Sequence, residues 1–152
     1  MTASETYHRP KTLEAALAHL AEGEPRIAAG CTDLFPATER KVLPGPVLDV
    51  TGIEELRDIA GGADGIPIGA TPTWRDLIDA DLPPAFAGLK QAARAVGARQ
   101  IQARGTLAGN LCNASPAADG VPPFLTLDTV VELNSVHGAR RLPLSAFITG
   151  PR

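Results

Sequence analysis

The stretch Gly105–Asp119 reads GTLAGNLCNASPAAD and combines small residues with two amides, a Ser-Pro pair and a single carboxylate. It contains no lysine, histidine or aromatic residue. Gly105 and Gly109 allow the backbone to approach a ligand closely, and Asn110 and Asn113 add amides that bond to sugars, phosphates or neighbouring backbone. The stretch therefore predicts a loop that contacts its ligand mainly through backbone groups.

A simpler interpretation of the same stretch stays open. In it the segment is a surface loop whose asparagines hold turns, and Asp119 caps a helix that begins near Gly120. The concentration of small residues favours a binding loop, because ordinary turns need fewer of them in one place.

A second segment with similar chemistry is Ala28–Leu34, AAGCTDL, which follows a predicted strand. Gly30 can adopt backbone angles closed to other residues, and Thr32 and Asp33 add a hydroxyl and a carboxylate. Successive N–H groups at the end of a strand bind phosphate without a formal positive charge. The alternative is a tight turn with Thr32 or Asp33 as an N-cap. Neither segment has the GxxxxGKS/T or GxGxxG pattern of the common nucleotide-binding loops.

The composition bounds the class of protein. The chain has 152 residues, of which 44% are hydrophobic and 20% are charged, as expected for one globular domain or part of a larger one. The 14 basic and 17 acidic residues give a net charge of −3, and the arginines form no stripe, so no nucleic-acid partner is expected. No apolar run approaches the ~18 residues of a membrane span, and the N-terminus lacks a signal-peptide pattern. A cytoplasmic protein is expected.

Few side chains offer catalytic or metal chemistry. Cys31 and Cys112 form no CxxC pair, so no four-ligand metal site is expected, and we predict two reduced, partly buried thiols. The three histidines are far apart in sequence, and surface positions are predicted for all of them, with His8 in a tail, His19 in a helix and His137 in a hairpin turn. No set of residues typical of acid–base or nucleophilic catalysis is present.

The first fifty residues predict a small α/β unit. TLEAALAHLAEG places four apolar residues on one helix face, with Thr12 as N-cap and Gly23 after the last turn. RIAAG predicts a short buried strand, and Val47–Val50 predicts a second one. We expect a boundary near Thr51 and Gly52, which divides the chain into units 1–51 and 52–152.

The second unit predicts a mixture of hairpins and helices. A Gly-Gly-Ala-Asp-Gly turn within residues 56–70 indicates one hairpin, and TVVEL and RLPL indicate another. Thr73 and Asp76 are spaced as a capping box, and AGLKQAARAVG has one apolar face. Trp74 beside the cap is expected to be a packing anchor. The last residues, LSAFITGPR, read as an element that is cut short.

Four segments together resemble one family. They are IAAGCTDLFP (27–36), IGATPTWRDL (68–77), RQIQARGTL (99–107) and RGTLAGNLCNASPAADGVPPFLTLD (104–128). They are similar, in order and spacing, to the FAD-binding medium subunit of the molybdenum hydroxylases, the group of xanthine dehydrogenase, carbon monoxide dehydrogenase and aldehyde oxidase. The resemblance implies an α/β (α+β) fold, the two-subdomain FAD-binding fold of the p-cresol methylhydroxylase type.

The resemblance also implies the cofactor site. The FAD diphosphate would be held from the first subdomain by Ala28, Ala29, Gly30, Cys31, Thr32, Asp33 and Leu34, and from the second by Thr106, Leu107, Ala108, Gly109 and Asn110. Asp119 would bind a sugar or ribityl hydroxyl, and Val96 matches a position that contacts the cofactor in some members. Arg99 and Arg104 flank the second segment, where they either attract a diphosphate or are simply solvated.

The resemblance implies an electron-transfer subunit of a larger oxidoreductase. Electrons would pass from a molybdenum-cofactor large subunit, through a small subunit with 2Fe–2S clusters, to FAD and then to an external acceptor. Cys31 stands where the family usually has glycine, and Ala108 replaces the first glycine of its GGN element. The resemblance implies that members continue into a C-terminal domain after the FITGPR-like segment where this sequence ends, so we expect either a fragment of a longer chain or a second polypeptide that completes the FAD domain. The alternative is a scaffold that keeps the fold, docks the partner subunits and binds no FAD.

Overall fold

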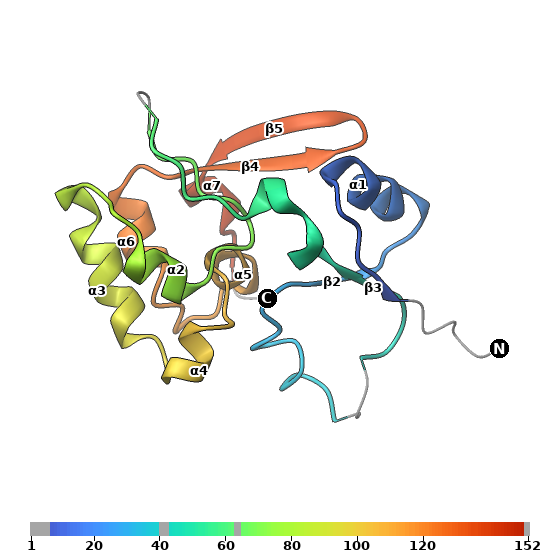
Figure 1. Ribbon diagram of the computed structural model, residues 1–152, viewed down its shortest axis with the longest axis horizontal. Helices are drawn as coiled ribbons and strands as arrows, with labels where there is room; N and C mark the ends of the chain where they lie inside the picture. The colour runs from blue at the N-terminus through green and yellow to red at the C-terminus, as the bar shows by residue number, and fades with distance from the viewer. Residues whose placement is uncertain (1–6, 40–42, 63–64, 151–152) are drawn as a thin grey trace.

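The computed structural model describes residues 7–39, 43–62 and 65–150 (Figure 1). The strands are β1 (Tyr7–His8), β2 (Arg26–Ala28), β3 (Val47–Asp49), β4 (Val130–Ser135) and β5 (Gly138–Pro143). The α-helices are α1 (Leu13–Glu22), α2 (Trp74–Asp79), α3 (Ala87–Ala95), α4 (Arg99–Gln102), α5 (Leu107–Asn113), α6 (Val121–Thr126) and α7 (Leu144–Phe147). Short 3₁₀ helices span Val50–Gly52, Glu54–Leu56 and Pro84–Phe86.

The N-terminal part is built on a parallel sheet with the strand order β1-β3-β2. Tyr7 and Arg26 both pair with Val47 in the central strand. The prediction of a tail at His8 was wrong, because His8 lies in β1 and its ring centroid is 4.1 Å from that of His19 in α1. A two-residue strand has almost no sequence signal of its own, since its pairing comes from a segment about forty residues away.

Helix α1 covers one face of this sheet and begins as predicted. The Thr12 side chain accepts a hydrogen bond from the Ala15 N–H, and Gly23 follows the last turn. Ala16 of α1 is buried with Leu48 of β3 and with Ile53. The prediction of a buried β2 was wrong for Ile27, which is 55% exposed because β2 is an edge strand.

A larger core organises the rest of the chain. Its buried members are Trp74, Leu77, Leu89, Ala93, Val96, Leu107, Phe124 and Leu144. The predicted capping box is present, since the Thr73 side chain accepts from the Asp76 N–H and the Asp76 side chain accepts from the Thr73 N–H. Trp74 is 2% exposed, which confirms it as a packing anchor.

Two antiparallel hairpins complete the second part. Isolated bridges join Ile59 to Ile68 and Gly62 to Gly65, as the predicted first hairpin requires, although residues 63 and 64 of its turn lie outside the described residues. Strands β4 and β5 form the second hairpin, whose turn is tighter than the predicted one because pairing continues to Ser135 and Gly138. This hairpin runs along one side of the molecule and its β4 strand contacts α1 (Figure 1).

The mixed α/β class is confirmed, with one hydrophobic cluster on the parallel sheet and a larger one among the later helices. The boundary predicted at Thr51 and Gly52 stays a prediction, and the first cluster includes Ile53 and Leu56 beyond it. Among the described residues, no helix is both long and apolar enough to span a bilayer.

Candidate functional site

The carboxyl ends of the three parallel strands meet at one edge of their sheet. Arg9 follows β1, the predicted first segment follows β2, and Thr51 follows β3. Ligands of α/β proteins bind at this edge, because chain segments leave it in loops with free backbone groups. The fold therefore places Ala28–Leu34 where a ligand site is expected.

The two predicted segments are in contact at this edge. A Cβ atom on Gly30 would lie 2.0 Å from the carbonyl oxygen of Arg104, so only glycine fits there. A Cβ atom on Gly105 would lie 3.4 Å from the Thr32 Oγ1. The Asn113 Nδ2 donates a hydrogen bond of 3.0 Å to the Asp33 Oδ1. Segments from different parts of the chain thus form one continuous surface.

The first segment forms a helical turn. The Phe35 N–H donates to the Cys31 carbonyl at 3.3 Å, and the Ala37 N–H donates to the Asp33 carbonyl at 3.1 Å. Within the described parts of the chain, the N–H groups of Thr32 and Asp33 have no acceptor. Free successive N–H groups of this kind form a concave anion-binding surface.

The second segment is not the loop that its composition predicted. Its residues Leu107–Asn113 form helix α5, with Thr106 as the N-cap whose side chain accepts from the Gly109 N–H at 3.1 Å. The helix ends at Ala114, which has a left-handed φ of 46°. The Ala108 N–H has no acceptor among the described residues, while the Leu107 N–H donates to the Pro72 carbonyl. This end of α5 leaves a backbone donor for a ligand.

The other residues predicted to contact the cofactor differ in how far they are buried. Val96 and Leu107 are 7% and 1% exposed and belong to the core, so only their backbone groups are candidates for ligand contact. Asn110 turns its Oδ1 inward, where it is buried with no partner among the described residues. Asp119 is exposed and caps nothing, since α6 has no side-chain cap. The interpretation of Asp119 as a helix cap was therefore wrong.

A polar network that sequence reasoning missed lies beside the first segment. The Tyr7 hydroxyl donates to Asp49, Arg9 forms an ion pair with Asp49 at 3.3 Å, and the Thr51 hydroxyl donates to Asp49 at 2.6 Å. Burial raises the pKa of Asp49, but the hydrogen bonds from Thr51 and Tyr7, helped by Arg9, outweigh it and lower the pKa overall. Asp49 is thus held as a carboxylate at the end of the sheet.

Cys31 lies next to this network in a strained conformation. Its φ is 60°, in the region that favours glycine. Burial raises the pKa of the Cys31 thiol, and the Asp49 charge adds to this, while Arg104 acts in the opposite direction. Cys31 and Cys112 form no disulfide, as predicted, but Cys112 is exposed and not partly buried. No group of three or more potential metal ligands occurs in the described part of the chain.

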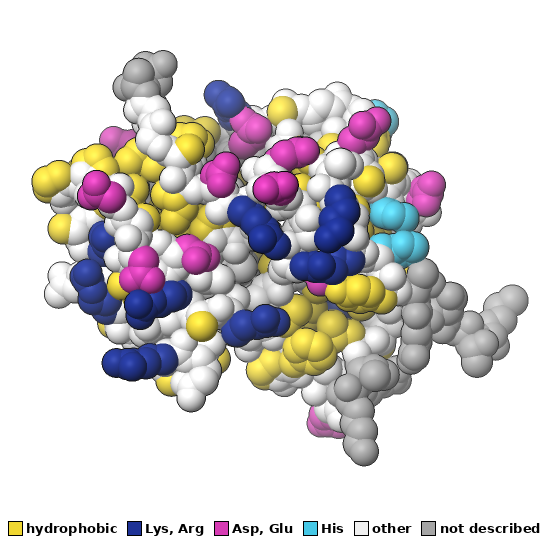
Figure 2. All heavy atoms as spheres, in the orientation of Figure 1, with side chains coloured by type: hydrophobic (Ala, Val, Ile, Leu, Met, Phe, Trp, Pro, Cys, Tyr) yellow, Lys and Arg dark blue, Asp and Glu magenta, His cyan; other side chains and the backbone are white. Residues whose placement is uncertain are grey.

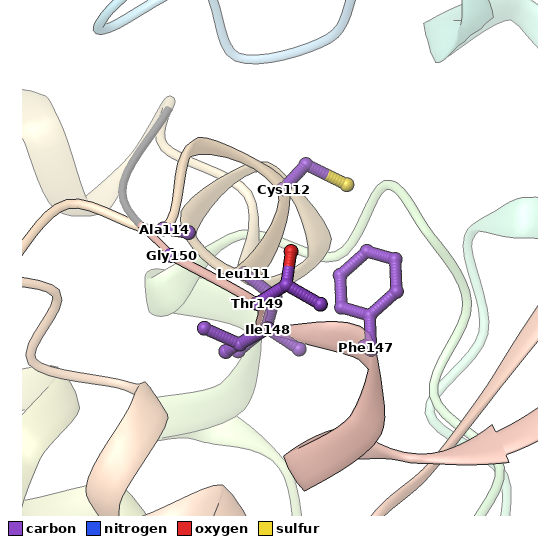
Figure 3. Close-up of a pocket in the computed structure, with 7 residues that line it drawn as sticks. All are labelled: Leu111, Cys112, Ala114, Phe147, Ile148, Thr149 and Gly150. Carbon is purple, nitrogen blue, oxygen red and sulfur yellow. The ribbon is translucent and has the colours of Figure 1, made fainter.

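Two hollows flank the meeting point of the segments. One of about 300 Å³ is lined by Ala29, Gly30, Thr51, Arg57, Thr71, Pro72, Thr73, Asp76, Ala103, Arg104 and Thr106. The other, of about 250 Å³, lies at the far end of α5 between Cys112 and Phe147, and both side chains point to the same side of it (Figure 3). The first hollow is polar and contains members of both predicted segments.

Comparison with known proteins identifies the relatives of this chain. Residues 2–152 match the family described as the FAD binding domain in molybdopterin dehydrogenase. The nicotinate dehydrogenase FAD-subunit of Eubacterium barkeri is 37% identical over 95% of this chain and 50% of its own length. The xanthine dehydrogenase FAD-binding subunit of Escherichia coli O157:H7 is 33% identical over 96% of this chain and 51% of its own length.

Solved structures give the same result. The CO dehydrogenase from Oligotropha carboxidovorans superposes with a TM-score of 0.85 at 30% identity, over 95% of this chain and 52% of that one. The quinoline 2-oxidoreductase from Pseudomonas putida 86 does so with a TM-score of 0.85 at 25% identity, over 99% and 54%. The chain spans about half the length of the relatives it matches. It belongs to the family of FAD-binding domains of molybdopterin dehydrogenases.

Proposed function

We propose that this chain is the FAD-binding part of an electron-transfer subunit in a molybdenum hydroxylase. In this proposal it works with a large subunit that carries the molybdenum cofactor and a small subunit that carries 2Fe–2S clusters, in the cytoplasm. When bound, FAD supplies the redox chemistry that links those centres to an external acceptor, and the protein positions it. The relatives from Eubacterium barkeri and Escherichia coli O157:H7 are named as FAD subunits of dehydrogenases, which supports this assignment.

The observation that carries the proposal is the contact between the two segments. The free N–H groups of Thr32 and Asp33 lie on one segment and that of Ala108 on the other, and the absence of a side chain at Gly30 lets the segments approach closely. Donors that converge without a formal charge suit the oxygens of a diphosphate. The residues present therefore fit FAD, with Ala28–Leu34 and Thr106–Asn110 as the diphosphate contacts and Asp119 as a partner for a hydroxyl.

Two substitutions change the details of this site. Cys31 and Ala108 replace glycines of the family pattern, and neither side chain takes up the free N–H donors by a hydrogen bond among the described residues. Cys31 turns its Sγ back to the Ala29 carbonyl at 3.5 Å, and Ala108 is a regular residue of α5. Both substitutions are compatible with a bound diphosphate, which argues against the scaffold alternative.

An absorption spectrum of the purified chain, alone and with its co-purifying subunits, tests the proposal. We expect flavin bands near ~450 nm in the assembled complex and the release of FAD by acid. The Gly30→Ala variant, in which the added methyl group should push the two segments apart, is expected to lose the flavin bands. A colourless complex that does not take up added FAD would overturn the proposal in favour of the scaffold. Bands in the complex but not in the isolated chain would indicate that another polypeptide completes the pocket.

A further inference from the structure

The charged residues of this chain are unevenly distributed along the sequence. Residues 82–118 contain Lys90, Arg94, Arg99 and Arg104 and no aspartate or glutamate, so this block carries a charge of +4. Of the 14 basic and 17 acidic residues of the chain, 10 basic and all 17 acidic ones lie outside the block, which gives the remainder a charge of −7. Charge of one sign that is collected in one region, on a chain of the opposite sign, produces a local field over that surface.

The fold places these side chains on the corner formed by α3 and α4. Lys90 and Arg94 are four positions apart in α3 and share one face of it, and Arg99 begins α4. Figure 2 shows Lys and Arg side chains gathered over the part of the molecule where Figure 1 places α3 and α4. Arg94 and Arg99 are exposed, and neither belongs to an ion pair within the described parts of the chain.

The backbone of this corner is held in place by local contacts. The Gln102 side chain donates to the carbonyl oxygens of Arg94 and Val96, at 3.2 and 3.0 Å, and so joins α4 to the end of α3. Gly97 makes the turn between the two helices with a φ of 45°, and a Cβ atom there would lie 3.1 Å from the Cβ of Ile101. The arginines therefore project from a preorganised surface, which lowers the entropy cost of binding a partner.

An exposed apolar side chain accompanies the arginines. Ile101 is 39% exposed, and the residues near it in the sequence, Ala95, Ala98 and Ala103, are small and exposed as well. Protein interfaces combine an apolar centre with arginines, which are enriched there relative to the rest of the surface. Single-stranded nucleic acids instead need exposed aromatic rings for stacking, and Phe86, the one aromatic residue of the block, packs against the larger core. The corner is therefore better suited to a protein than to a nucleic acid.

We propose that the corner of Arg94, Arg99 and Ile101 is a docking surface for a protein whose own surface carries carboxylates around a shallow apolar recess. Complementary charge steers such an encounter and fixes the relative orientation of the two proteins. The inference rests on the proposed function in one respect, since the partner is expected to be one of the subunits that work with this chain. The three residues belong to neither of the two segments assigned to the FAD diphosphate, so docking is separate from cofactor binding.

The test compares variants of the chain within the complex that it forms with its co-purifying subunits. Arg94→Glu and Arg99→Glu are each expected to weaken the association about tenfold at ~0.1 M salt, measured by analytical ultracentrifugation. At ~1 M salt the difference from the parent should shrink, because screening shortens the reach of a charge to about 3 Å. Arg99→Lys keeps the charge and should keep most of the affinity. Arg140→Glu is the matched control, because it makes the same charge change at an exposed position of β5, on the opposite side of the molecule from α4 (Figure 1).

Thermal unfolding and flavin content are measured on the same samples. The glutamate variants are expected to keep the Tm of the parent, because both arginines are exposed, and to keep its flavin content. The proposal is overturned if both glutamate variants associate like the parent at every salt concentration, or if Arg140→Glu weakens the association equally. Normal association with a loss of binding to anionic phospholipid vesicles would also overturn it, in favour of a membrane surface. A parent complex without flavin whose association still depends on the arginines would overturn the proposed function alone.

Discussion

Asn113 at the end of α5 donates a hydrogen bond to Asp33 in the first segment, and the two residues are 80 positions apart in the chain. This bond joins the C-terminal end of α5 to the first segment, next to the free N–H group of Asp33. It is solvent-exposed, so its energy is modest, but its position makes it a measure of how the two segments are aligned.

Exchanging the two partners tests this alignment. Asn113→Asp places two carboxylates opposite each other, and we expect it to lower the free energy of unfolding by about 1 kcal/mol. The double variant with Asp33→Asn and Asn113→Asp restores one donor and one acceptor, so it should recover most of that loss. Urea unfolding of the two single variants and the double variant measures the coupling. Additive effects with no recovery would show that the two side chains do not interact in solution.

The contact at Gly30 predicts a severe effect from a small change. Gly30→Ala adds a methyl group that would meet the Arg104 carbonyl at 2.0 Å, so the backbone of one segment must move. We expect a loss of about 1–3 kcal/mol of stability and a large fall in FAD affinity. Gly23→Ala is the control, because a Cβ atom there meets nothing within 4 Å. Thermal unfolding and flavin fluorescence quenching check both effects, and equal behaviour of the two variants would contradict the contact.

Backbone strain at Cys31 predicts a substitution that stabilises the protein. With φ at 60°, Cys31→Gly should raise the free energy of unfolding by about 1 kcal/mol, because a Cβ atom disfavours this region. Cys31→Ala removes the thiol but keeps the Cβ atom, so no comparable gain is expected. The difference between the unfolding free energies of the two variants, measured by chemical unfolding, separates the effect of the backbone from that of the sulfur. A gain in both variants would assign the effect to the sulfur.

The network around Asp49 predicts a dependence of stability on pH. The folded pKa of Asp49 is below its usual value of about 3.9, so the unfolded state binds more protons in this range. The contribution of Asp49 is therefore present above that value and is lost as the pH falls through the folded pKa. We expect the urea midpoint of Asp49→Asn to fall less steeply from about pH 5 to about pH 2 than that of the parent. Asp81→Asn, at an exposed position, should leave the steepness unchanged.

Features with local causes could be predicted from the sequence. Helix α1 begins after Thr12 and ends before Gly23, as predicted, because the capping side chain and the terminating residue are adjacent to the helix in the sequence. The Thr73–Asp76 capping box likewise joins two residues that are three positions apart in the sequence. In both cases the side chain that accepts the hydrogen bond and the backbone N–H that donates it are three residues apart, so no knowledge of the fold is required.

Features that depend on distant contacts could not be predicted in the same way. Helix α5 contains Gly109 and two asparagines, which have low helix propensity, and it exists because Leu107 is buried in the core and Thr106 caps it. The polar network of Asp49 needs Tyr7 and Arg9, which meet it only through the β1–β3 pairing. The sequence showed that both segments are rich in small and polar residues, but it could not show the contact between Gly30 and Arg104.

Because Asp33 and Asn113 are 80 residues apart, the ribosome synthesises the two segments at different times. At the usual rate of translation, the second segment leaves the ribosome roughly 4 to 16 s after the first. Under the proposed function, the nascent chain has only one of the two diphosphate-binding segments during that interval. The proposed function therefore predicts that flavin loads after translation of the second segment, and that a nascent chain arrested before residue 106 binds none.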